Sequence, residues 1–234
     1  GSVWAMDFTE PQTRIDGIHK YIFQVRDLAS KDILLAQPVG TYDGKVVRDM
    51  LTALIAWHGA PLVIKSDNGP GFIAKETREF IAENDIFHLL SPPGTPQYNG
   101  ACEAGMGMIQ SRTFFEAARN DRPAFWTSDD VYAAKRYANE VVRPKDSPSW
   151  PTAQQVFDAR RPPTKEERQS FRENYERFEK EARAEERPRD EPKDGKQAEP
   201  EWKYQARIDR IAITKTLLEE ELLFVRRRRI SPPI

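Results

Sequence analysis

Three carboxylates occupy positions from which they could do chemistry. Asp7 lies within an alternating apolar segment, Asp67 ends a short apolar run, and Glu103 follows the breaker-rich stretch SPPGTPQYNGAC at residues 91–102. Thirty-five residues separate Asp67 from Glu103. Taken singly, each has an ordinary explanation: a solvated strand residue, a turn-forming Asp and a Glu favoured by the dipole at a helix start.

Taken together, these carboxylates predict a site for hard divalent cations. Strand ends and a crossing helix can bring three such groups close, and like charges at that distance need a counter-ion to remain ionised. Mg²⁺ prefers few carboxylates, several waters and substrate phosphates. Two such ions about 3.5–4 Å apart would clamp the attacking and leaving oxygens of a phosphoryl displacement. The site therefore points to phosphoryl transfer.

The elements that must position these groups form an α/β pattern. Alternation of apolar residues or short apolar runs predict strands at residues 3–10, 21–29, 32–39, 61–69 and 86–90. Helical spacing of apolar residues predicts helices at residues 44–59, 75–85, 101–120 and 128–143. In the first strand, Trp4, Met6 and Phe8 share one face, and Asp7 lies on the other. Three strands followed by alternating strand and helix predict a mixed sheet with helices on its faces.

Composition divides the 234 residues into a core and an extension. Residues 164–234 hold 18 Lys/Arg and 17 Asp/Glu, whereas nearly all strongly apolar runs come earlier. We expect a tag remnant at residues 1–2, a catalytic core at 3–163, and a charged helical extension at 164–234. A polar, breaker-rich flexible linker is expected around residues 188–201.

The extension should contain two helices with apolar seams. The first seam is formed by Phe171, Tyr175 and Phe178, and the second by Ile208, Ile211, Leu218, Leu222 and Val225. Ion pairs at i,i+4, such as Glu179 with Arg183, support the first helix. The seams predict contact with another subunit or with the core. The terminal arginine run could neutralise phosphates or could equally be a solvated tail.

Several classes of protein do not fit this composition. No apolar run approaches the roughly 20 residues of a membrane span, and no signal peptide is visible. The lone cysteine, Cys102, excludes an internal disulfide and argues against a cysteine-built zinc site. Although Cys102 is next to Glu103, a lone cysteine is more often a small buried residue than a nucleophile. We interpret Trp4, Trp57, Trp126 and Trp150 as packing residues. These features favour a cytoplasmic protein without a membrane partner.

Three motifs carry a resemblance to a known family. They are W-x-x-D-F-T in the first strand, S-D-N-G at the end of a later strand, and S-P-P-G-T-P-Q-Y-N-G-A-x-E before a helix. Over roughly residues 3 to 160 the sequence resembles the catalytic core of DDE transposases, which include retroviral-type integrases and bacterial insertion-sequence transposases. The resemblance implies an RNase H-like fold, a five-stranded mixed sheet flanked by helices. It also implies that Asp7, Asp67 and Glu103 are the catalytic, metal-binding triad.

The resemblance further implies how DNA is held. In this family the loop before the glutamate, here residues 94–100, grips DNA near the scissile phosphate. The residues expected to face DNA are Asn68, Gln97, Tyr98, Asn99, Gln110, Arg112, Arg226, Arg227, Arg228 and Arg229. Related cores often carry Asn or Lys where this chain has Gly107 and Gln110. Gly105 and Gly107 each cost about 1 kcal/mol of helix propensity relative to Ala.

The implied activity is metal-dependent DNA transposition or integration. Hydrolysis at an element's end would free a 3′-OH, which would attack a phosphodiester of target DNA. The implied cofactor is Mg²⁺ or Mn²⁺, with two ions per site when DNA is bound. Implied partners are DNA ends, target DNA and further copies of the chain in a bacterial cytoplasm, without a small-molecule cofactor. Two alternatives remain open: an RNase H-like nuclease without joining activity, and a non-catalytic DNA-binding or assembly relative.

Overall fold

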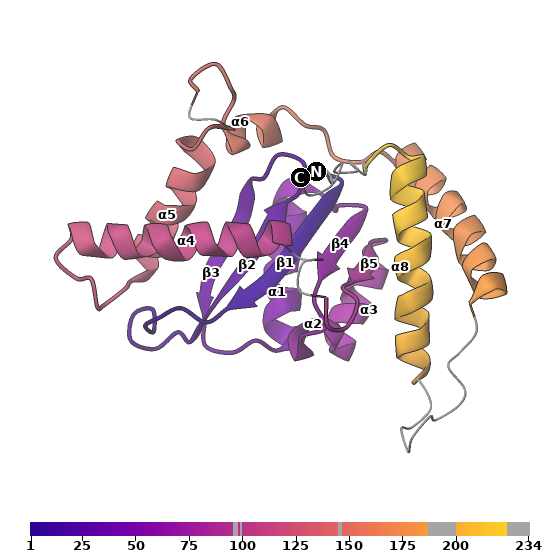
Figure 1. Ribbon diagram of the computed structural model, residues 1–234, viewed down its shortest axis with the longest axis horizontal. Helices are drawn as coiled ribbons and strands as arrows, with labels where there is room; N and C mark the ends of the chain where they lie inside the picture. Colours follow the sequence, from indigo (N-terminus) through magenta and orange to yellow (C-terminus); the bar gives the residue numbers. More distant parts are fainter. Residues whose placement is uncertain (96–97, 99, 145–146, 187–199, 224–234) are drawn as a thin grey trace, which may run out of the picture. The chain divides into compact units, whose positions relative to one another are not determined.

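A computed structural model describes residues 1–95, 98, 100–144, 147–186 and 200–223 (Figure 1). The chain divides into two compact units, Gly1–Lys165 and Glu166–Ile234. The predicted linker at 188–201 lies almost wholly outside the described residues, as does the arginine run at 226–229. Among the helices that are described, none is long and apolar enough to cross a membrane.

The first unit is built on a five-stranded mixed sheet in the order β3-β2-β1-β4-β5. β1 is antiparallel to β2 and parallel to β4, β2 is antiparallel to β3, and β4 is parallel to β5. The strands are β1 Val3–Thr9, β2 Tyr21–Asp27, β3 Ile33–Val39, β4 Val63–Ser66 and β5 Phe87–Leu90. All five predicted strands and the predicted mixed sheet are confirmed. The fold is the RNase H-like fold that the resemblance implied.

Six helices accompany this sheet in the described part of the first unit. They are α1 Gly44–His58, α2 Pro70–Ile73, α3 Lys75–Glu83, α4 Gly100–Arg119, α5 Ser128–Glu140 and α6 Ala153–Asp158. The four predicted helices are confirmed. The short helices α2 and α6 were missed, because four or six residues give too little periodicity to recognise. Gly59 ends α1 at a positive φ of 77°, as its position in the sequence predicted.

Two apolar cores form on the two faces of the sheet. Trp4 and Met6 of β1 pack with Phe23 of β2 and with the stripe of α1 that contains Leu51. On the other face, residues of β2 and β3 pack with Ile109 of α4 and with α5. Figure 1 shows α4 crossing in front of the sheet and α1 behind it. Since Asp7 alternates with Met6 and Phe8, its side chain belongs to the face that α4 crosses.

The tryptophan interpretation is correct at two positions and wrong at two others. Trp4 and Trp126 are buried, but Trp57 is 85% exposed and Trp150 is also exposed. The buried stripe of α1 runs through Leu51 and Leu54 and continues to His58, whose ring contacts Phe157. Trp57 falls beside this stripe rather than on it.

The described part of the second unit is formed by helix α7 Lys165–Glu185, whose first residue ends the first unit, and helix α8 Glu201–Glu219. Ala182 of α7 packs with Tyr204 and Ile208 of α8, and the Tyr175 hydroxyl donates to Asp209 Oδ1 at 2.7 Å. The predicted ion pair between Glu179 and Arg183 is present at 2.8 Å.

The predicted apolar seam of α8 is only partly correct. Ile208 is buried as expected, but Leu218 and Leu222 are exposed, because Leu217 takes the inward position and the helix ends at Glu219. Val225, the last member of the predicted seam, lies outside the described residues.

Candidate active site

The three predicted carboxylates line one open cleft of about 440 Å³. Asp7 comes from β1, Asp67 follows the end of β4, and Glu103 lies in the first turn of α4. The complete lining consists of Asp7, Asp67, Asn68, Gly69, Ser91, Pro92, Gly94, Thr95 and Glu103. Two adjacent strand ends, the segment before α4 and the start of α4 therefore meet here, and residues far apart in the sequence share one solvent-filled space.

Strand pairing explains why the two aspartates meet. β1 and β4 run parallel, and Ala5 is paired with Lys65. Asp7 lies two residues after Ala5, and Asp67 lies two residues after Lys65. Because parallel strands advance together, both aspartates arrive at the same edge of the sheet. Backbone amides then fix their orientation: the Phe8 N–H donates to Asp7 Oδ1 and the Gly69 N–H donates to Asp67 Oδ1, each at 2.8 Å.

Gly105 explains how α4 comes close enough to contribute Glu103. A Cβ atom at Gly105 would lie 2.6 Å from Gln24 Nε2 and 3.0 Å from Arg26 Nη1, so glycine lets α4 approach β2 without displacing these side-chain ends. The helix propensity lost at Gly105 is thus offset by packing. Gly107 is different, because its Cβ would meet no atom within 4 Å.

The first turn of α4 has one buried and one exposed side. The Cys102 side chain is fully buried, and burial raises the pKa of its thiol far above the ordinary value. It is therefore a packing residue rather than a thiolate at neutral pH. Glu103, the next residue, is exposed and faces the cleft.

Hydrogen bonds between β4 and β5 hold the rim of the cleft. The Asn68 amide donates to the Ser91 carbonyl at 2.8 Å, and the Ser91 hydroxyl donates to the Ser66 carbonyl at 3.0 Å. The Ser66 hydroxyl and His88 Nε2 are 2.9 Å apart. Burial, together with the charge of Arg78, lowers the pKa of His88 to about 4. The imidazole is therefore neutral at pH 7 and acts as a structural hydrogen-bond partner.

The donor chemistry of the cleft fits a hard divalent cation. Its acidic groups offer only oxygen atoms, and the opening leaves room for waters and a phosphate, which is what Mg²⁺ requires. In the part of the chain that is described, no group of three or more His, Cys, Asp or Glu side chains is placed so that it could hold a metal ion by itself. Because Mg²⁺ uses one or two carboxylates and completes its shell with water and substrate, such a cage is not required.

The residues predicted to face DNA have mixed positions. Asn68 lines the cleft, but its side-chain amide already donates a hydrogen bond to the Ser91 carbonyl. Gln110 donates to the Thr9 hydroxyl at 2.5 Å. Arg112 is paired with Glu116 and its guanidinium lies 3.6 Å from the centroid of the Tyr137 ring. Tyr98 is half-buried. The remaining predicted contacts, Gln97, Asn99 and Arg226, Arg227, Arg228 and Arg229, lie outside the described residues.

Lys65 does not line the cleft, but it contacts the segment before α4, and sequence reasoning missed it. Its ammonium donates to the carbonyl oxygen of Tyr98 and lies 4.1 Å from the centroid of that residue's ring. The available signal was a lysine within a short apolar strand, two residues before Asp67. A charge at such a position needs a partner when it is buried.

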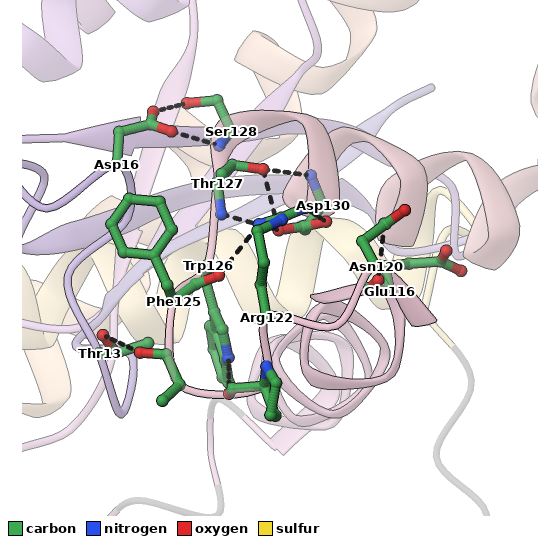
Figure 2. A network of polar contacts seen from close by, with 12 residues as sticks. Thr13, Asp16, Glu116, Asn120, Arg122, Phe125, Trp126, Thr127, Ser128 and Asp130 are labelled. Atoms are coloured by element: carbon green, nitrogen blue, oxygen red, sulfur yellow. Dashed lines mark hydrogen bonds and ion pairs between the residues drawn. The ribbon is translucent and has the colours of Figure 1, made fainter. Parts of the chain in front are cut away.

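A second hollow, of about 380 Å³, opens further along α4. It is lined by Gln12, Gly107, Gln110, Ser111, Phe114, Phe115 and Trp126. Beside it, the segment between α4 and α5 is held by polar contacts (Figure 2). Arg122 and Thr127 converge on Asp130, and Asp16 of the β1–β2 loop accepts from Ser128. These contacts set the start of α5 against the loop and so support the far end of α4.

Comparison with known proteins finds similarity to integrases in the first unit. Residues 1–96 match the family model described as integrase core domain. The Pol-related polyprotein of the mouse intracisternal A-particle MIA14 is 33% identical over 166 residues, which are 63% of this chain and 19% of the polyprotein. The insertion element IS476 uncharacterized 39.2 kDa protein of Xanthomonas euvesicatoria is 26% identical over 113 residues, 48% of this chain and 32% of that protein. The chain thus spans less than a third of the length of either relative.

A solved structure has the same fold. The catalytic core domain of HTLV-2 integrase, in a trimeric form in complex with magnesium, superposes with a TM-score of 0.54 at 20% identity. The match covers 67% of this chain and 95% of that domain. This chain is thus similar to the integrase core domain over residues 1–96, and its first unit shares the fold of the HTLV-2 domain.

Proposed function

We propose that this chain is a DDE-type polynucleotidyl transferase, which cuts a DNA strand and transfers a 3′-OH end to a phosphodiester of target DNA. The observation that carries the proposal is the single cleft lined by Asp7, Asp67 and Glu103. The integrase core domain match over residues 1–96 supports the same reading. The acidic groups of the cleft also support the proposal, because they offer only oxygen ligands to a cation.

In this proposal, Asp7, Asp67 and Glu103 hold Mg²⁺ or Mn²⁺, with two ions when DNA is bound. Bound cations would neutralise phosphate charge and make water or a 3′-OH a better nucleophile. The protein's own groups would orient the carboxylates and so align the reacting atoms. The amides of Phe8 and Gly69 fix two of the carboxylates, and the close approach at Gly105 sets the third against them. Alignment of reactants is the main contribution a protein makes to phosphoryl transfer.

The proposed partners are DNA ends, target DNA and further copies of the chain. The HTLV-2 core domain is described in a trimeric form, which supports a homo-oligomer here. The insertion-element relative from a bacterium supports action in a bacterial cytoplasm. Tyr98 and Asn68 are the described members of the proposed DNA-contacting set that lie nearest to the acidic residues in the chain.

A cleavage and joining assay tests the proposal. Wild-type protein and Glu103→Gln are incubated with end-labelled duplex DNA and Mn²⁺, and a labelled 3′-OH donor is supplied in a second reaction. We expect Mn²⁺-dependent nicking and joined products, both reduced about 10³-fold or more in the variant, because several kcal/mol of charge stabilisation is lost. Nicking without joined products would favour a nuclease. Nicking that is absent, or equal in Glu103→Gln, would contradict the proposal.

A further inference from the structure

We infer that Lys65 is a positioning residue: it holds Tyr98 in place and thereby keeps the first turn of α4, with Glu103, at the cleft edge formed by Asp67. The inference rests on the proposed function, since it concerns how the acidic groups of that site are kept together. It assigns Lys65 no contact with DNA, cation or reacting atoms.

Two different contacts join Lys65 to the same residue. The Lys65 ammonium donates a hydrogen bond to the carbonyl oxygen of Tyr98, and it lies 4.1 Å from the centroid of the Tyr98 ring. A charge-assisted hydrogen bond is about twice as strong as a neutral one. A cation against an aromatic face adds about 0.5–2 kcal/mol, depending on how far it is desolvated. Together, the contacts restrain both the backbone and the side chain of Tyr98.

We call the two contacts between Lys65 and Tyr98 the tether, and its Lys65 end is fixed in the sheet. Lys65 lies in β4, where it is paired with Ala5 of β1 on one side and with Leu89 of β5 on the other. A residue between two neighbouring strands cannot move without disturbing both ladders. Lys65 therefore holds Tyr98 to a fixed point in the sheet.

The tether spans the gap between two elements of the site. Lys65 comes two residues before Asp67, and Tyr98 comes five residues before Glu103. One end thus belongs to the strand that leads to Asp67, and the other belongs to the approach to α4. Within the described residues, the Lys65 ammonium forms no ion pair with an acidic side chain, so its charge is directed at Tyr98.

Three variants test the inference. Lys65→Met keeps the alkyl length and removes the charge, whereas Lys65→Arg keeps a cation that can bind a carbonyl and stack on a ring. Lys75→Met is the matched control, since it removes a lysine that is 78% exposed and distant from these contacts in the fold. Hydrogen exchange is followed at amides 104–108, the first hydrogen-bonded amides of α4. Nicking of labelled DNA is followed as a function of Mn²⁺ and DNA concentration.

We expect Lys65→Met to exchange faster at amides 104–108, while its melting temperature stays close to that of wild type. Nicking should fall about 10–100-fold, the usual range for losing a group that orients a metal ligand. The loss should appear in kcat and in the Mn²⁺ concentration needed, together with a smaller rise in KM for DNA, since Tyr98 belongs to the proposed DNA-contacting set. Lys65→Arg should restore exchange protection and most activity, and Lys75→Met should match wild type.

Unchanged exchange at amides 104–108 in Lys65→Met would overturn the inference, as would a loss of activity expressed only in KM for DNA. Equal damage in Lys65→Arg and Lys65→Met would also overturn it. The exchange measurement needs no DNA chemistry. If wild-type protein proves inactive, the proposed function fails while the tether is still tested by exchange alone.

Discussion

Two groups of acidic side chains in the first unit differ in what surrounds them. At the start of α5, Asp130 is 2% exposed and accepts hydrogen bonds from two nitrogens of Arg122, at 2.9 and 3.0 Å, and from the amide and hydroxyl of Thr127. At the cleft, Asp67 accepts from the backbone amide of Gly69, and Glu103 is exposed.

The difference separates structural carboxylates from candidate functional ones. Burial alone would raise the pKa of Asp130, but the bonds from Arg122 and Thr127 outweigh it and lower that pKa below its ordinary value. The chain has thus supplied every partner this carboxylate needs. The cleft carboxylates line a space of about 440 Å³, which leaves room for a cation and a phosphate beside them. Substitutions in the two groups should therefore affect different properties.

The largest expected effect is on activity at the cleft. Asp67→Asn keeps an oxygen for the Gly69 amide but removes the charge, so nicking of labelled DNA should fall about 10³-fold or more. Unfolding in urea should show a stability within about 1 kcal/mol of wild type, or higher, because a solvated charge beside others is removed. If Asp67→Asn nicks DNA normally, or if it unfolds, then Asp67 does not differ from Asp130 in the way proposed.

The next effect is on stability at the start of α5. Asp130→Ala removes the ion pair with Arg122 and the capping box at the start of α5, and loss of the capping box should lower the free energy of unfolding by about 1–2 kcal/mol. Urea denaturation measures this value. Asp129→Ala, at the exposed neighbouring position, is the control and should cost about 0.5 kcal/mol through the helix dipole. Equal losses in the two variants would mean that the polar network contributes nothing.

A pH effect should come from His88 of β5, whose ring nitrogen contacts the Ser66 hydroxyl. Its pKa in the folded protein is about 4, against an ordinary value of 6.5, so below pH 6.5 the unfolded chain binds the proton and the folded one does not. Stability is therefore lost as pH falls from 6.5 towards 4, and the loss is about 2 kcal/mol at pH 5.

His88→Gln separates this contribution from other titrating groups. The glutamine can still contact Ser66 but does not titrate, so the difference between its unfolding free energies at pH 7.5 and pH 5 should be smaller than in wild type. Asp32 works in the opposite direction, since burial raises its pKa to about 6, and it remains present in both proteins. The same pH dependence of stability in wild type and His88→Gln would show that His88 is not its source.

The smallest effect concerns the two glycines of α4. Gly107→Ala places a methyl group in open space and should stabilise the protein by about 1 kcal/mol through helix propensity. Gly105→Ala drives a methyl group against Gln24 and should destabilise it instead. Thermal unfolding compares the two. Stabilisation by both substitutions would show that α4 does not depend on the close approach.

Much of the first unit could be predicted because its apolar periods are unambiguous. The alternation of Trp4, Met6 and Phe8 predicted β1 and placed Asp7 on the opposite face, and the stripe of α1 was equally regular. The convergence of Asp7 and Asp67 follows from parallel pairing of β1 and β4, which the propensities of either strand alone do not specify.

Other features depend on tertiary contacts that no local pattern records. Gly105 resembles a defect in helix propensity until its distance to Gln24 is known. Lys65 resembles an ordinary strand lysine, although its charge is used on a residue 33 positions away. Asp130 and Glu103 each stand near a helix start, and only burial and hydrogen-bond partners distinguish their surroundings.

The most direct test of the central claim is the location of the bound metal. Crystals of the protein with a DNA end would be soaked in Mn²⁺, and anomalous difference maps collected for wild type and Asp67→Asn. We predict a peak in the cleft in contact with Asp7 and Asp67 of the wild-type protein, with Glu103 beside it, and no such peak in the variant. Mn²⁺ bound elsewhere in the wild type, or carboxylates that remain too far apart to share an ion with DNA present, would contradict the account.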